Sequence, residues 1–309
     1  MFLISFFGFL HRLSFKKCHL WVIIVVFLYV PSFVHSQPSG HFDPSSLSPI
    51  QKGEFLLAQS LNDEALRLYE FLIDEGRGDG YAFRGMVRAY KNMNKLKDAE
   101  VWIENFLVDN LDSSPALYAS GYVNYLKKDM EKAEYFFYRA LEFNANNALA
   151  LNNLGTILLC KESYNQAAEK VREAIRINPK EPIFFYNLEA IYKKMGDPGL
   201  IIADYNFYLE HGAPDLVRGY GMAVGRYMRQ AGFKLYNAGR LDEAIRKFME
   251  IETVFKRIKH QRGLVPIYFS LGLLYEEKGD FESAKKYFVQ VLTLSSLHIQ
   301  AKERLKRLQ

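Results

Sequence analysis

Four alanines of this chain recur at one fixed interval. Ala65, Ala99, Ala133 and Ala167 follow one another at steps of 34 residues. A fixed period of this length is typical of proteins that stack one supersecondary unit many times. Such a unit cannot bury its apolar face alone, so each unit must pack against its neighbours. The alanine spacing therefore constrains the fold more than any other feature of the sequence.

A glycine precedes an alanine by twelve residues in five places. The pairs are Gly53 with Ala65, Gly121 with Ala133, Gly155 with Ala167, Gly232 with Ala244, and Gly272 with Ala284. Antiparallel helices whose axes approach within about 10 Å need small side chains where they cross. Large residues lie four positions after these alanines, on the same helical face. They include Tyr69, Phe137, Val171, Phe248 and Phe288. The pattern predicts antiparallel helix pairs joined by short turns.

Two segments carry the pattern most completely. One contains Leu154-Gly155, Ala167, Ala174 and Pro179; the other contains Leu271-Gly272, Tyr275, Gly279, Ala284 and Phe288. These residues resemble the tetratricopeptide repeat (TPR). The resemblance implies an all-α fold, a right-handed superhelical solenoid of about seven helix-turn-helix units with a C-terminal capping helix. The seven units are expected at 46–79, 80–113, 114–147, 148–181, 182–215, 225–258 and 265–298.

The predicted units are not equally regular. The fifth has Glu189 and Ile201 where small residues are expected, so its two helices should splay apart. Around the sixth unit the interval grows from 34 to 43 and then 40 residues, and the inserted segments lack strong helix breakers. We expect them to lengthen helices rather than to form loops. The solenoid is accordingly assigned to 50–298, and a polar-faced capping helix to 299–309.

The first 36 residues are typical of a signal peptide. Lys16 and Lys17 precede an apolar run from Leu20 to Val30, and Val34-His35-Ser36 offers a cleavage site. The run is shorter than the ~20 residues that span a bilayer, and an uncleaved membrane anchor is the alternative. Residues 37–49 are rich in Ser and Pro and are expected to form a linker. We expect an exported protein, periplasmic or secreted, which contacts the membrane only if its N-terminal segment is not cleaved.

Charge and motifs argue against several classes of function. The net charge is +5, and it falls to +2 without residues 1–36, which carry Arg12, Lys16, Lys17 and no acid. Elsewhere, basic residues mostly alternate with acids, so no nucleic acid is expected as a partner. Only Cys160 lies beyond the signal, which rules out a disulfide within the mature chain. No phosphate loop, metal-ligand spacing or nucleophile motif is found. We predict no catalytic residue, no cofactor and no metal.

The resemblance also implies where a partner binds, because the first helix of each unit lines the concave groove in that family. The groove residues expected on this basis are Arg84, Arg88, Lys91, Tyr118, Tyr122, Tyr125, Asn152, Tyr186, Lys193, Arg226 and Arg229. Arginines pair well with carboxylates, and tyrosines add contact area at low entropic cost. These positions therefore suit an extended or helical acidic peptide. The alternative is that they form ordinary solvated helix faces.

The expected function is a non-enzymatic scaffold or adaptor that binds such a segment of a partner protein, within an envelope or secretion assembly. The competing hypothesis is a structural protein whose repeats stack between chains into a homo-oligomer.

Overall fold

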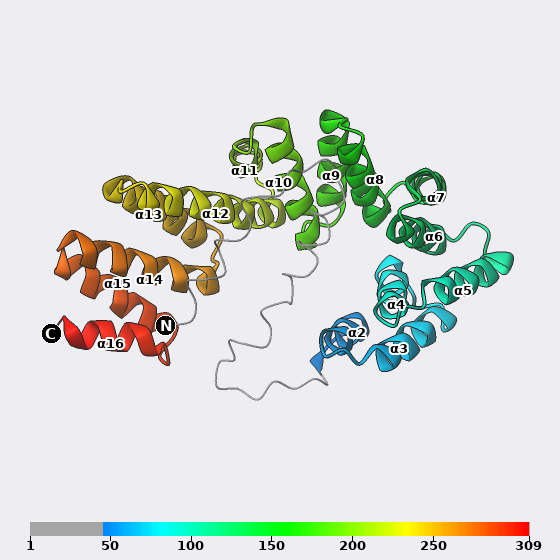
Figure 1. Ribbon diagram of the computed structural model, residues 1–309, viewed down its shortest axis with the longest axis horizontal. Coiled ribbons are helices and arrows are strands. Elements are labelled where there is room, and N and C mark those ends of the chain that lie inside the picture. The colour runs from blue at the N-terminus through cyan, green and yellow to red at the C-terminus, as the bar shows by residue number, and fades with distance from the viewer. Residues whose placement is uncertain (1–45, 309) are drawn as a thin grey trace, which may run out of the picture. The chain divides into compact units, whose positions relative to one another are not determined.

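The computed structural model describes residues 46–308. This part of the chain forms fifteen α-helices joined by short turns, and it contains no β-strand (Figure 1). Residues 1–45 and 309 lie outside it, so the predicted signal peptide and most of the predicted linker are not described. Of the fifteen helices, none has both the length and the apolar character that crossing a bilayer requires.

The described residues fall into two compact units that divide between Leu111 and Asp112. The first unit holds α2 (Pro49–Ala58), α3 (Asn62–Asp74), α4 (Gly80–Asn92) and α5 (Leu96–Asp109). The second holds α6 (Ser114–Lys127), α7 (Met130–Phe143), α8 (Ala148–Cys160), α9 (Tyr164–Ile177), α10 (Pro182–Met195), α11 (Leu200–Glu210), α12 (Pro214–Asn237), α13 (Leu241–Arg257), α14 (Gln261–Lys278), α15 (Phe281–Leu294) and α16 (Ile299–Arg307). One continuous stack over 50–298 stays a prediction.

Consecutive helices form seven antiparallel pairs, from α2–α3 to α14–α15, and α16 follows the last pair. The prediction of an all-α repeat fold of about seven helix-turn-helix units is confirmed.

Local sequence sets the helix ends. Asp79 accepts hydrogen bonds from the backbone N–H groups of Tyr81 and Ala82 at the start of α4. Gly279 ends α14 with a φ of 83°, a left-handed conformation that glycine adopts without strain.

The helices of a pair cross where the sequence places its glycine and alanine. A Cβ atom on Gly155 would lie 2.4 Å from Cγ2 of Val171, and one on Gly272 would lie 2.5 Å from the Phe288 ring. Ala167 is fully buried at the same crossing as Gly155. No side chain larger than hydrogen fits at these glycines unless the neighbouring residue moves. The predicted pairing of small residues with a large one is confirmed.

Tyr69 extends this packing across three helices of the first unit. Its buried ring lies against Gly53 of α2 and Gly85 of α4, where added Cβ atoms would approach to 2.4 and 2.2 Å. Burial raises the pKa of its hydroxyl above the usual range. Tyr69, on the second helix of its pair, thus packs against the first helix of its own pair and against the first helix of the next pair.

The fifth pair departs from this packing. Helix α10 contacts α9 and α12 more than its own pair partner α11, in keeping with the bulky Glu189 and Ile201 at its crossing. Polar contacts join the helices instead. Arg172 of α9 donates to the hydroxyl of Tyr192 at 2.8 Å, and this hydroxyl donates to the carboxylate of Asp204 on α11. The arginine and the carboxylate also form an ion pair.

Helices around the sixth pair are longer than those elsewhere. Helices α12, α13 and α14 have 24, 17 and 18 residues, whereas α8 and α9 have 13 and 14. The extra residues of this region are therefore helical, and α13 and α14 are each extended by about one turn.

Gly272→Ala is expected to lower the free energy of unfolding by about 1–3 kcal/mol, because the added methyl group overpacks the contact with Phe288. This loss opposes the ~1 kcal/mol by which alanine favours a helix over glycine. Urea denaturation followed by circular dichroism measures it. Gly272→Ala/Phe288→Leu should recover part of the loss. A single variant as stable as the wild type would contradict the close approach.

Candidate functional site

Three of the predicted groove residues lie together on α4 in the first unit. Arg84, Arg88 and Lys91 follow one another at helical spacing, so their side chains share one face. The guanidinium carbon of Arg84 lies 4.9 Å from the centre of the Tyr81 ring. Burial lowers the pKa of Lys91, and the charge of Arg88 lowers it further. This face of α4 therefore concentrates positive charge.

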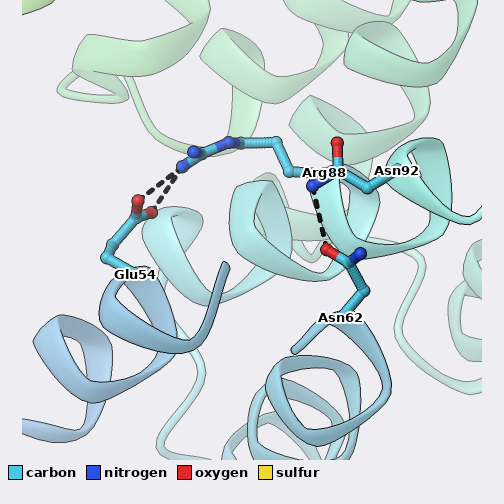
Figure 2. Close-up of polar contacts among 4 residues, drawn as sticks. All are labelled: Glu54, Asn62, Arg88 and Asn92. Atoms are coloured by element: carbon cyan, nitrogen blue, oxygen red, sulfur yellow. Dashed lines mark hydrogen bonds and ion pairs between the residues drawn. The ribbon is translucent and has the colours of Figure 1, made fainter. Parts of the chain in front are cut away.

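A carboxylate from the preceding pair reaches this face. Figure 2 shows Arg88 of α4 directed at Glu54 of α2; Nη1 of Arg88 donates to the two carboxylate oxygens at 2.7 and 2.6 Å. Beside it, Asn92 donates its amide to Asn62 at 2.9 Å. The Arg88 side chain is 35% exposed, and that of Glu54 is 33% exposed. The ion pair therefore joins the first helices of two successive pairs while staying open to solvent.

Glu54 is not among the residues predicted from the sequence, although the sequence carries a signal for it. Glu54 lies 34 residues before Arg88, at the same position of the preceding repeat. A comparison of equivalent positions in neighbouring repeats would have found it. The predicted basic ridge is therefore partly neutralised within the chain.

Tyr118 corrects the predicted tyrosine ridge of the second unit. Its side chain is 1% exposed, lies 5.8 Å from the Phe137 ring of α7 and stacks on Tyr122 at 6.0 Å. The prediction that Tyr118 lines an accessible groove is wrong, because its ring faces the partner helix and fills the core of the third pair. Tyr122 and Tyr125 remain partly exposed on α6.

Asn152 requires the same correction. It is 4% exposed on α8, and its amide oxygen accepts a hydrogen bond from Asn187 of α10 at 2.8 Å. Its own amide donates to the Asn153 side chain at 3.2 Å. A buried amide needs such partners because an unpaired one is costly. Asn152 thus connects α8 to α10 and does not lie on an open surface.

Arg226 resembles Arg88 in being paired within the chain. Its guanidinium lies 4.2 Å from the centre of the Tyr186 ring and forms an ion pair with Glu189 of α10. Burial raises the pKa of Glu189 more than the charge of Arg226 lowers it. Lys193 and Arg229, the remaining predicted groove residues, are exposed at the surface.

These contacts share one arrangement, in which a residue of one first helix pairs with a residue of the next. The pairs are Glu54 with Arg88 in the first unit, and Asn152 with Asn187 and Glu189 with Arg226 in the second. Within each unit, we call the face of the first helices that carries these contacts the ladder face. It offers charged and aromatic side chains for contact. Within residues 46–308, no group of three His, Cys, Asp or Glu side chains could hold a metal ion.

Residues 265–296, which span most of α14, all of α15 and two residues beyond it, match the family model described as tetratricopeptide repeat. A comparison with curated proteins finds no match. Among solved structures, the C-terminal part of a TPR repeat-containing protein from Cytophaga hutchinsonii is 14% identical with a TM-score of 0.44, over 83% of this chain and 99% of that one. A tetratricopeptide repeat protein from Parabacteroides merdae is 15% identical with a TM-score of 0.35, over 84% and 82%. YrrB, described as a TPR protein with an unusual peptide-binding site, is 20% identical with a TM-score of 0.33, over 66% and 97%. Superposition is weak in each case, so none of these proteins bears on what this chain binds.

Arg88→Glu is expected to lower the free energy of unfolding of the first unit by about 1 kcal/mol, because it replaces a half-exposed ion pair with two facing carboxylates. Thermal denaturation measures the change. The exchanged pair, Glu54→Arg/Arg88→Glu, should regain most of the loss. An exchanged pair no more stable than the single variant would contradict the proposed role of the contact.

Proposed function

We propose that this chain, in which residues 265–296 match the tetratricopeptide repeat, is a non-enzymatic adaptor that holds a partner protein through an acidic peptide segment. A fold of stacked helix pairs presents long runs of side chains for contact with other proteins. The coarse function, a scaffold for protein–protein interaction, follows from this fold. The acidic character of the segment is the proposal.

The positive face of α4 carries the proposal. Arg84, Arg88 and Lys91 lie on one side of this helix, and Glu54 is the carboxylate that reaches Arg88. Lys91 is half-buried next to Arg88, and like charges at this spacing repel each other. A carboxylate from a partner would relieve this repulsion and form charge-assisted hydrogen bonds. The three cationic side chains on one helix face thus favour an acidic segment over a neutral one.

Residues of the second unit support the same partner chemistry. Tyr122 and Tyr125 are partly exposed on α6, and Lys193 and Arg229 are exposed on α10 and α12. Partly exposed tyrosines provide broad contact at low entropic cost. An acidic segment that also carries apolar side chains would use both kinds of residue.

Site-specific photo-crosslinking in cells of the native source tests this function. A benzoylphenylalanine residue in place of Lys91 or Tyr125 should crosslink a partner segment that mass spectrometry shows to be rich in Asp and Glu. The control places the same residue at Val101, an exposed position on the second helix of its pair. Arg84→Glu in the Lys91 probe should reduce crosslinking at least fivefold without changing the circular dichroism spectrum. The proposal would be contradicted if only the Val101 probe formed crosslinks, or if the crosslinked segments were not rich in Asp and Glu.

We also propose that the adaptor works outside the cytoplasm, in an envelope or secretion assembly. Support comes from the sequence alone: Lys16 and Lys17, the apolar run that follows them, and the site at Ser36. Protein isolated from its native source should begin at Gln37 or close to it. A chain that keeps residues 20–34 and sediments with membranes would indicate an uncleaved anchor. A full-length chain in the cytoplasmic fraction would overturn export.

A further inference from the structure

A hollow of about 430 Å³ opens beside the junction of α13 and α14, away from the residues of the ladder face. Leu264, Tyr268 and Leu294 form its apolar floor, and Lys256 and Lys259 line it with their charged side chains. Leu264 and Tyr268 are buried, whereas Leu294 is 37% exposed. We call this site the junction hollow. Its volume lies within the range of sites that take a few side chains or a small ligand.

Unequal helix lengths produce the junction hollow. Helix α13 ends thirteen residues after Ala244, whereas α15 ends ten residues after the equivalent Ala284. Helix α14 begins eleven residues before Gly272, whereas α8 begins seven residues before the equivalent Gly155. Three or four residues are about one helical turn. The added turns of α13 and α14 therefore extend past the end of α15, which is too short to cover them.

The lining of the hollow is positively charged. Residues 253–275 contain Lys256, Arg257, Lys259 and Arg262 but no Asp or Glu. Lys256 forms an ion pair with the buried Glu252 at 2.5 Å. No ion pair joins Lys259 to a carboxylate of residues 46–308, and its side chain is exposed. A ligand of the hollow therefore meets at least one cation whose charge is not already compensated.

A neighbouring hollow of about 270 Å³ lacks this character. It lies between α11, α12 and α13, and its lining includes the carboxylate of Glu250 beside Arg257. Of these two hollows, the junction hollow is the one whose lining residues include lysines and no carboxylate.

We propose that the junction hollow is a second docking site for a partner protein, and that it takes a peptide segment with one large apolar side chain beside carboxylates. The apolar side chain would cover Leu264, Tyr268 and Leu294, and removing their surface from water favours binding. The carboxylates would pair with Lys259 and share Lys256 with Glu252. Gln261 and Gln290 also line the hollow and offer amide groups to a peptide backbone. The site is formed by the second helices α13 and α15 and the start of α14, so it is independent of the ladder face.

Selection from a random dodecapeptide phage library on the purified chain tests the proposal. The library should yield peptides with Leu or Phe flanked by Asp or Glu. The most enriched peptide, labelled with fluorescein, is then titrated against the variants by fluorescence anisotropy. Lys259→Glu should weaken its binding at least tenfold by reversing the charge. Thr293→Trp should do the same by filling the hollow, which this residue lines.

Lys286→Glu is the matched control, because it reverses an exposed charge on α15 at a residue that does not line the hollow. It should leave binding within twofold of the wild type. Lys91→Glu, on the ladder face, separates this site from the one proposed above. A peptide that loses affinity in Lys91→Glu but not in Lys259→Glu would overturn the junction hollow and leave the ladder face standing. Enriched peptides without acids, or equal binding by all variants, would overturn it as well.

Discussion

The close crossing of two helices within each pair is the constraint on which the rest of the structure depends. Where Gly155 meets Val171 and Gly272 meets Phe288, the space of a single Cβ atom is already occupied. This approach lets the buried alanine four residues before the large side chain contact the facing helix. With the crossing set, the first helices of successive pairs can lie side by side within a unit, as α2 and α4 or α8 and α10 do. Side chains one repeat apart can then meet.

The ladder of contacts between first helices follows from that repetition. Glu54 meets Arg88 across 34 residues, Asn152 meets Asn187 across 35, and Glu189 meets Arg226 across 37. These contacts use the same side chains that a repeat fold offers to partners. A partner bound to the ladder face, as proposed above, would have to add to these contacts or exchange them. On α4, Arg84, Arg88 and Lys91 share one face of the helix, and Glu54 pairs with Arg88.

Departures from the 34-residue period create surface that the regular repeat lacks. The longer α13 and α14 leave α15 one turn short, and the junction hollow lies at that step. The fifth pair departs differently: with bulky residues at its crossing, α10 and α11 are held through Arg172, Tyr192 and Asp204. The irregular pairs thus differ from the regular ones in both their packing and the surface that they present.

The sequence by itself determined the helix pairs, their order and their crossings, because a period of small and large residues records packing that recurs in every unit. It also located the insertions that lengthen α12 to α14. It did not reveal which side chains on a helix face would be accessible. Tyr118 and Asn152 occupy repeat positions that were predicted to face a partner. Tyr118 instead packs on Phe137, and Asn152 forms a hydrogen bond with Asn187. Only the tertiary structure decided this, because burial and pairing depend on neighbours in the partner helix and in the next repeat, whereas helical periodicity reports only the face on which a residue lies.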